Sequence, residues 1–230
     1  MLIIFDLDDT LIDTSGSIIP GLLRNALQAM QKKGLEVSDF DRTYQRLLHF
    51  DRNHPNSRSA LLEFLEIYGA PQACYDEGIR EVYEEPIYSN PIQPIDDAIE
   101  VLHELAESYQ LALVTKGKEH IQKEKMRRAK IPIKLFRYLC FCEEGPLSGP
   151  GKKGFYESIG REIGISPSQV LVCGDRISID LTPAKELGYK TVQMRWGRGL
   201  GNTGLKKDVD YTILHLNELG PIAKQVKNMS

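Results

Sequence analysis

LIIFDLDDT, residues 2–10, is a short apolar run that leads directly into three aspartates. The run 2–5 is apolar throughout rather than alternating, which is typical of a strand buried on both faces of a parallel sheet. In such a sheet the carboxyl ends of the strands face the crevice that binds ligands. Asp6 and Asp8 follow this strand with i, i+2 spacing, so both are expected to face one small site.

Further apolar runs follow along the chain, each ending in turn or polar residues. They cover 111–114, 139–142, 170–173, 191–194 and 211–213. Helical spacing of apolar residues lies between them, for example at 95–107 and 154–163. Residues 166–169, SPSQ, have the form of a helix-capping box with proline at the first helical position. This alternation from about residue 91 onward predicts an α/β fold with a doubly wound parallel sheet.

The stretch from 15 to 90 breaks this pattern, because it has helical spacing but no clear strand run. Its first helix has an apolar stripe that ends at Gly34, and the stripe consists of Ile19, Leu22, Leu23, Ala26, Leu27 and Met30. Further helices are expected at 40–50, 59–68 and 72–84. A helical block of this length is too long for a crossover between two strands. The sequence therefore predicts an α/β core of residues 1–14 and 91–230 with an inserted helical cap of residues 15–90.

Composition excludes several classes of protein. The 230 residues are 41% hydrophobic and 27% charged, as in ordinary globular proteins. The 29 basic and 32 acidic residues give a net charge of -3, so nothing in the overall charge attracts nucleic acid or an anionic membrane. No apolar run could span a bilayer, and no secretion signal is visible. The four cysteines lack CxxC spacing and are expected to be free thiols in a reducing, cytoplasmic location.

Polar residues also end the later strands of the predicted sheet. Thr115-Lys116-Gly117 ends the second strand, where a hydroxyl and backbone N–H groups can hold a phosphoryl oxygen. Gly174-Asp175 ends the fourth strand, and Asp180 follows it closely. The basic run 116–130 has interleaved acids and no stacking aromatic residue, so a solvated helix face is expected there rather than a nucleic-acid site.

Four carboxylates are thus expected at one edge of the sheet: Asp6, Asp8, Asp175 and Asp180. Carboxylates that converge in this way repel one another and need a hard divalent cation. A site with few carboxylates and open water positions suits Mg²⁺, which we therefore predict as the cofactor. Lys152 and Lys153 lie between the third strand and its helix, where either can supply fixed positive charge.

Four segments, in this order, resemble the motifs of the haloacid dehalogenase (HAD) superfamily of phosphohydrolases. They are FDLDDTL at 5–11, LALVTKG at 111–117, GKKGFYESIG at 151–160 and VLVCGDRISIDLTPAKELG at 170–188. The resemblance covers the core, and the insert between the first two strands resembles the helical type-one cap of that superfamily. It implies a Rossmann-like core and hydrolysis of the phosphate monoester of a small metabolite.

The resemblance also implies a role for each acid. Asp6 is expected to be the nucleophile and Asp8 the general acid and base, while Asp175 and Asp180 complete the Mg²⁺ site. Attack by Asp6 on phosphorus gives an aspartyl phosphate, which water then cleaves. Asp8 is in reach to protonate the leaving alkoxide and later to accept a proton from the attacking water.

Thr115 and a lysine are expected to bind the phosphate, and Lys116 lies beside them in the sequence. In the superfamily the lysine usually stands a few residues before an aromatic helix start, often as Lys-Pro. This chain has no proline there, so both Lys152 and Lys153 are candidates. Counting back from the aromatic pair at 155–156 favours Lys152.

Three other functions share parts of this pattern. A haloacid dehalogenase needs the nucleophile but neither a metal nor a leaving-group acid, so Asp8, Asp175 and Asp180 argue against it. A phosphomutase uses the same chemistry and retains the intermediate for re-transfer. A receiver-type signalling domain gathers similar residues around Mg²⁺, but its phosphoacceptor follows a middle strand and it needs no helical insert.

The identity of the substrate is expected to depend on the cap, where Arg52, His54 and Arg58 cluster. These side chains either overhang the site and contact the substrate or simply lie on the surface. The sequence leaves this choice open, together with the particular phosphomonoester and the oligomeric state.

Overall fold

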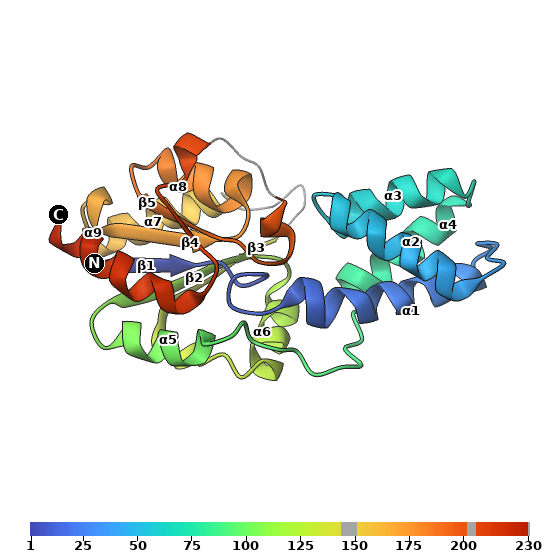
Figure 1. Cartoon of the computed structure of the whole chain (residues 1–230), viewed down its shortest axis with the longest axis horizontal. Coiled ribbons are helices and arrows are strands. Elements are labelled where there is room, and N and C mark those ends of the chain that lie inside the picture. Colours follow the sequence, from blue (N-terminus) through green and yellow to red (C-terminus); the bar gives the residue numbers. More distant parts are fainter. Residues whose placement is uncertain (144–150, 202–205, 230) are drawn as a thin grey trace. The chain divides into compact units, whose positions relative to one another are not determined.

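The computed structural model describes residues 1–143, 151–201 and 206–229 (Figure 1). The chain forms two compact units, one of Met1–Thr14 with Ile92–Ser230 and one of Ser15–Pro91. In the described residues the first unit contains a parallel sheet with helices, and the second contains helices only. No helix within these residues has both the length and the apolar character needed to cross a lipid bilayer.

A six-stranded sheet forms the centre of the first unit, and all its strand pairs are parallel. The strands are β1 (Leu2–Phe5), β2 (Gln110–Lys116), β3 (Phe136–Cys142), β4 (Val170–Gly174), β5 (Lys190–Met194) and β6 (Tyr211–Ile213). Their order in the sheet is β3-β2-β1-β4-β5-β6. The strands β2 and β3 are added on one side of β1 and the later strands on the other, so the strand order reverses between β1 and β4. The predicted doubly wound α/β fold is confirmed. Ligands of such sheets bind at this reversal, beyond the carboxyl ends of the strands.

Helices cover both faces of the sheet (Figure 1). Helices α5 (Ala98–Ala106) and α6 (Glu119–Arg128) lie on one face, and α7 (Gly151–Ile163) and α8 (Thr182–Lys185) lie on the other; α9 (Leu219–Asn228) ends the chain. Every residue of β1 is at most 1% exposed, because this strand is central and covered on both sides. Burial of each such aliphatic side chain contributes about 1.5–3 kcal/mol, which anchors the strand that carries the first acids.

The second unit consists of helices α1 (Ile19–Lys32), α2 (Phe40–Asn53), α3 (Ser57–Ile67) and α4 (Gln72–Ile79), followed by a π-helical turn (Arg80–Glu84). The predicted apolar stripe of α1 is buried along its whole length. Asp39 and Asn56 begin the next two helices, since their side chains accept the N–H of Arg42 and Ser59 at 3.0 and 2.9 Å.

Two local predictions differ from the structure. Strand β3 begins at Phe136, before the predicted 139. It is an edge strand whose residues between Phe136 and Cys142 are exposed or partly buried, and such a strand lacks a continuous apolar run. Residues 166–169 do not begin an α-helix as predicted. They form a single 3-10 turn (Pro167–Gln169) without a side-chain cap bond, because β4 begins at the next residue.

Candidate active site

The aspartate that follows β1 is held beside the end of β4. Phe5 pairs with Cys173 in the sheet, and the Asp6 N–H donates to the Cys173 carbonyl at 2.9 Å. This bond continues the ladder by one residue and brings the Asp6 side chain to the reversal point of the sheet. Asp175 follows β4 directly, so the two acids leave adjacent strands at the same edge.

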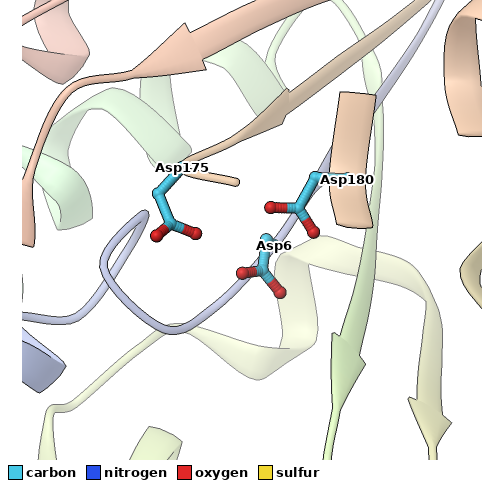
Figure 2. Close-up of side chains that lie close together, drawn as sticks. All are labelled: Asp6, Asp175 and Asp180. Atoms are coloured by element: carbon cyan, nitrogen blue, oxygen red, sulfur yellow. The ribbon is translucent and has the colours of Figure 1, made fainter. Parts of the chain in front are cut away.

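Three carboxylates converge at this edge, as Figure 2 shows. One oxygen each from Asp6, Asp175 and Asp180 lies within 4.8 Å of the other two, and all three residues are buried. Asp180 comes from the π-helical turn Ile177–Leu181 after β4. Its approach requires Gly174, because a Cβ at that position would lie 2.6 Å from the Asp180 Cβ. The strand end must therefore be glycine for the third acid to reach the group.

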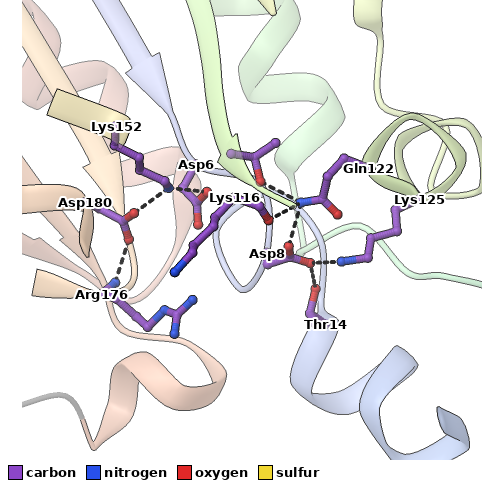
Figure 3. A network of polar contacts seen from close by, with 10 residues as sticks. Asp6, Asp8, Thr14, Lys116, Gln122, Lys125, Lys152, Arg176 and Asp180 are labelled. Carbon is purple, nitrogen blue, oxygen red and sulfur yellow. Dashed lines mark hydrogen bonds and ion pairs between the residues drawn. The ribbon is translucent and has the colours of Figure 1, made fainter. Parts of the chain in front are cut away.

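Lys152, at the start of α7, lies against two of these acids (Figure 3). Its ammonium donates to Asp6 Oδ1 at 2.6 Å and to Asp180 Oδ1 at 2.5 Å, and all three side chains are buried. Lys153 instead pairs with Glu186 at the exposed surface. Of the two lysines that the sequence left as candidates, the structure brings Lys152 to the carboxylates.

The electrostatics of this group record an excess of negative charge. Burial raises the pKa of Asp6 to about 6; Lys152 opposes this rise, while Asp180 and Asp8 add to it. The pKa of Asp175 is raised well above its usual value by burial, then by the nearby Asp180 and Asp6. Burial lowers the pKa of Lys152, but Asp180 and Asp6 raise it well above its usual value overall. The Lys152 ammonium and the Arg176 guanidinium together do not balance three carboxylates at this site.

A divalent cation fits this donor set. The three acids offer only hard oxygen ligands, which Mg²⁺ prefers, and they come from positions fixed by the sheet. The raised pKa values of Asp6 and Asp175 indicate that added positive charge would stabilise their ionised forms. The structure thus brings together Asp6, Asp175 and Asp180 of the four predicted metal ligands.

The fourth predicted ligand, Asp8, lies outside this group of three. Its Oδ1 accepts from Lys125 Nζ at 2.8 Å and from Thr14 Oγ1 at 2.5 Å, and its Oδ2 accepts from Gln122 Nε2 at 2.9 Å (Figure 3). Burial raises the pKa of Asp8, but Lys125 and the bonds from Gln122 and Thr14 lower it to about 2 overall. The predicted role of Asp8 as a metal ligand therefore stays a prediction.

The phosphate-binding candidates on β2 are linked to the Asp8 group by the Gln122 amide. Thr115 is fully buried, and its Oγ1 accepts from Gln122 Nε2 at 2.7 Å. The Lys116 carbonyl accepts from the same amide at 3.2 Å, whereas the exposed Lys116 side chain points toward the side of the network that holds Asp6 and Asp180 (Figure 3).

Sequence reasoning missed four polar residues of this network: Thr14, Gln122, Lys125 and Arg176. Arg176 directly follows Asp175 in the sequence; its N–H donates to Asp180 Oδ2 at 2.9 Å. Gln122 and Lys125 lie in the basic run that was expected to be a solvated helix face. That expectation is wrong for these two, which are 1% and, for the lysine side chain, 13% exposed. Their i, i+3 spacing, which places both on one face of α6, was the only signal in the sequence.

Two of the three candidate specificity residues, His54 and Arg58, have partners within the helical unit. Both ring nitrogens of His54 face acceptors: Nε2 donates to Glu63 Oε2 at 2.8 Å and Nδ1 to the Phe50 carbonyl at 2.6 Å. The Arg58 guanidinium lies 5.1 Å from the centre of the Tyr83 ring, and Arg52 is exposed. Contact of these residues with a substrate stays a prediction.

With this fold and this group of acids in place, comparison with known proteins defines the class. The model of the haloacid dehalogenase-like hydrolase family matches residues 1–188, and the chain belongs to that family. A glyceraldehyde 3-phosphate phosphatase from Pyrococcus furiosus is 28% identical, with 94% of this chain and 90% of the relative covered. A protein of the same name from Methanopyrus kandleri is 30% identical, with 85% and 84% covered.

Solved structures share the fold. The HAD-hydrolase YfnB from Bacillus subtilis, whose structure was determined with magnesium bound, superposes with a TM-score of 0.68 over 96% of this chain and 97% of that one. The identity of 18% makes this a likeness of fold alone. Membership of this family excludes the receiver-type alternative, because the family model matches residues 1–188 and so includes the helical insert that a receiver domain does not need.

Proposed function

We propose that this enzyme hydrolyses a small phosphate monoester in a Mg²⁺-dependent reaction that passes through a phosphorylated Asp6. The observation that carries this proposal is the buried group in which Asp6, Asp175 and Asp180 share one edge with Lys152. A carboxylate nucleophile must approach a phosphate dianion, so it needs neutralising charge around the reacting atoms. The family match and the relatives named as phosphatases support the same chemistry.

The roles in this proposal follow the positions of the side chains. A carboxylate oxygen of Asp6 attacks phosphorus as the bond from phosphorus to the ester oxygen breaks. Asp8 donates a proton to the leaving oxygen, and Thr115, Lys116 and Lys152 bind the phosphoryl oxygens. Water then attacks phosphorus and gives its proton to Asp8, which releases inorganic phosphate and restores the Asp6 carboxylate. Mg²⁺, held by Asp6, Asp175 and Asp180, supplies positive charge that offsets the charge of the phosphate.

The ionised state of Asp8 sets a condition on this reaction. With a pKa of about 2, Asp8 is a carboxylate in the structure, yet it must hold a proton when the ester oxygen departs. A bound phosphate dianion close to Asp8 favours the protonated form, since like charges disfavour ionisation. We propose that binding of the substrate raises the pKa of Asp8, which then takes up a proton from solvent water.

The first candidate substrate is glyceraldehyde 3-phosphate, after which the relatives at 28% and 30% identity are named. Its leaving group is an alkoxide, so its hydrolysis needs the proton of Asp8. A cytoplasmic location, with the four cysteines as the free thiols found here, stays a prediction.

The test is a panel assay of the purified protein with glyceraldehyde 3-phosphate, other alkyl phosphates and p-nitrophenyl phosphate. We expect release of inorganic phosphate with Mg²⁺, little with Ca²⁺, whose larger and more flexible shell spoils in-line geometry, and none in excess chelator. Full activity in chelator would contradict the metal site. Halide release from a 2-haloacid would favour the dehalogenase alternative, and isomerised phosphate esters without free phosphate would favour a phosphomutase.

A further inference from the structure

The helix that follows β2 presents two polar side chains to the site, and the roles described above leave both unused. Gln122 and Lys125 are three residues apart on α6, so they lie on the same face of the helix. The opposite face is solvated, as expected for a basic surface helix; Lys123 on that face is half exposed and pairs with Glu119. One face of α6 therefore contacts the site, whereas the opposite face contacts solvent.

Gln122 connects two candidate catalytic residues through one amide nitrogen. Its Nε2 lies 2.9 Å from Asp8 Oδ2 and 2.7 Å from Thr115 Oγ1. Gly117 leaves space for it: a Cβ at position 117 would lie 3.2 Å from the Gln122 side chain, and the φ of +140° suits glycine. The turn that ends β2 is therefore shaped around this glutamine.

Lys125 fixes the other oxygen of the same acid. Its ammonium lies 2.8 Å from Asp8 Oδ1, with the lysine side chain 13% and the Asp8 side chain 25% exposed. Thr14 donates to the same oxygen. With donors on both carboxylate oxygens, the side-chain torsion of Asp8 is set by α6 and by the segment after β1 together.

We infer that Lys125 and Gln122 are positioning residues for Asp8, which they hold at the orientation needed for proton transfer. This inference rests on the proposed function, because it presupposes that Asp8 transfers a proton. It assigns Lys125 and Gln122 no contact with the phosphate. Proton transfer requires a heavy-atom distance of about 2.6–3.2 Å, so a small displacement of the acid has a large effect on rate. A misplacement of about 1 Å costs on the order of 100-fold.

The experiment is a double-mutant cycle between Lys125 and Asp8, with turnover of an alkyl phosphate as the readout. Lys125→Met removes the ammonium but keeps the length of the side chain, and Lys123→Met removes one lysine from the exposed face of the same helix. The probe is glyceraldehyde 3-phosphate or whichever alkyl ester of the panel the wild-type protein hydrolyses fastest. Lys125→Gln replaces Lys125→Met if the latter fails to fold, as judged by thermal unfolding.

We expect Lys125→Met to lower kcat by roughly 10- to 100-fold with KM within about twofold of wild type, and Lys125→Arg to recover most of the loss. In the Asp8→Asn protein the same Lys125→Met change is expected to cost less than about twofold, because a positioning residue has no effect without the residue it positions. Lys123→Met is expected to be neutral in both proteins.

Three results would overturn the inference: an equal loss in both backgrounds, no loss in the wild-type background, or a loss of the same size from Lys123→Met. The first would mean that Lys125 acts on the fold or the substrate rather than through Asp8. A wild-type protein that releases no phosphate from any ester would contradict the proposed function itself, which separates the two kinds of failure.

Discussion

Asp6 and Asp8 are two residues apart, yet the structure gives them opposite surroundings. Asp6 lies with two other buried acids and shares one lysine with Asp180, and its pKa rises to about 6, first because of burial. Asp8 is also largely buried, but an ammonium, an amide and a hydroxyl surround it, and its pKa falls to about 2. The same residue type thus becomes a member of a crowded anionic group in one place and a fully bonded carboxylate in the other.

This difference shows that the neighbours of an acid, rather than its place in the motif, decide what it can do. The carboxylates of Asp6, Asp175 and Asp180 repel one another, and an added cation stabilises them. Such surroundings suit a nucleophile beside a metal. The Asp8 group is already neutralised by its donors, so this acid can give a proton only after bound substrate has favoured its protonated form. Four changes test the contrast, from the largest expected effect to the smallest.

Asp6→Asn should abolish turnover, because the amide cannot form the phosphorylated intermediate. We expect a loss of roughly 10⁴-fold or more, down to the background rate, on every ester. The measurement is phosphate release at saturating Mg²⁺. Residual activity within 100-fold of wild type would exclude Asp6 as the nucleophile.

Asp8→Asn should give a loss that depends on the leaving group. An alkyl phosphate, which needs a proton at the leaving oxygen, should react roughly 10²- to 10⁴-fold more slowly. An aryl phosphate departs without a proton, so it should still phosphorylate Asp6, and dephosphorylation should then lag. Acid-quenched protein is expected to carry a hydroxylamine-sensitive phosphate on the peptide that contains Asp6. Equal slowing of both esters, with no phosphate on that peptide, would contradict the role of Asp8 as the proton donor.

Lys152→Met and Lys153→Met form a matched pair of adjacent lysines. The first removes the cation that contacts Asp6 and Asp180, so we expect kcat/KM to fall roughly 10²- to 10³-fold. The second removes an exposed ion pair with Glu186 and should change activity less than about twofold. Steady-state kinetics of both variants with one ester shows which lysine acts at the site. Similar losses of kcat/KM in the two variants would contradict the choice of Lys152.

The stability of the metal-free protein should fall as the pH rises from about 4 to about 7. A carboxyl whose pKa is higher in the folded than in the unfolded protein binds its proton more tightly when folded, so Asp6 and Asp175 lower the free energy of unfolding as they ionise. For Asp6 the window runs from its ordinary 3.8 to about 6, with an effect of about 1–3 kcal/mol.

Chemical denaturation in chelator across this pH range measures the effect, and Asp6→Asn should flatten the profile. Asp8 has the opposite sign: its stabilisation is complete above pH 3.8 and is lost as the pH falls toward 2. Mg²⁺ is expected to restore more stability at pH 7 than at pH 4. A profile with the same slope in wild type and Asp6→Asn would show that Asp6 is not the source.

Much of this protein was predictable from its sequence for a simple physical reason. Buried parallel strands are apolar throughout, so β1 and β4 could be read as uninterrupted runs, and the residues after them had to meet at one edge of the sheet. The same reasoning placed Asp6 and Asp175 together. It failed at β3, an edge strand with partial exposure, and at 166–169, where a local capping pattern had no room for a helix.

Only the tertiary structure decided which partners each acid has. Lys125 is 117 residues from Asp8 in the chain, and Lys152 is 146 residues from Asp6. Sequence spacing reports which residues share a strand end or a helix face, but a hydrogen bond depends on distances of a few tenths of an ångström between elements packed from distant segments. The local sequence therefore determines the acids and the sheet edge where they meet. The packing of α7 and α6 against the sheet determines that Lys152 pairs with the anionic group and Lys125 with Asp8.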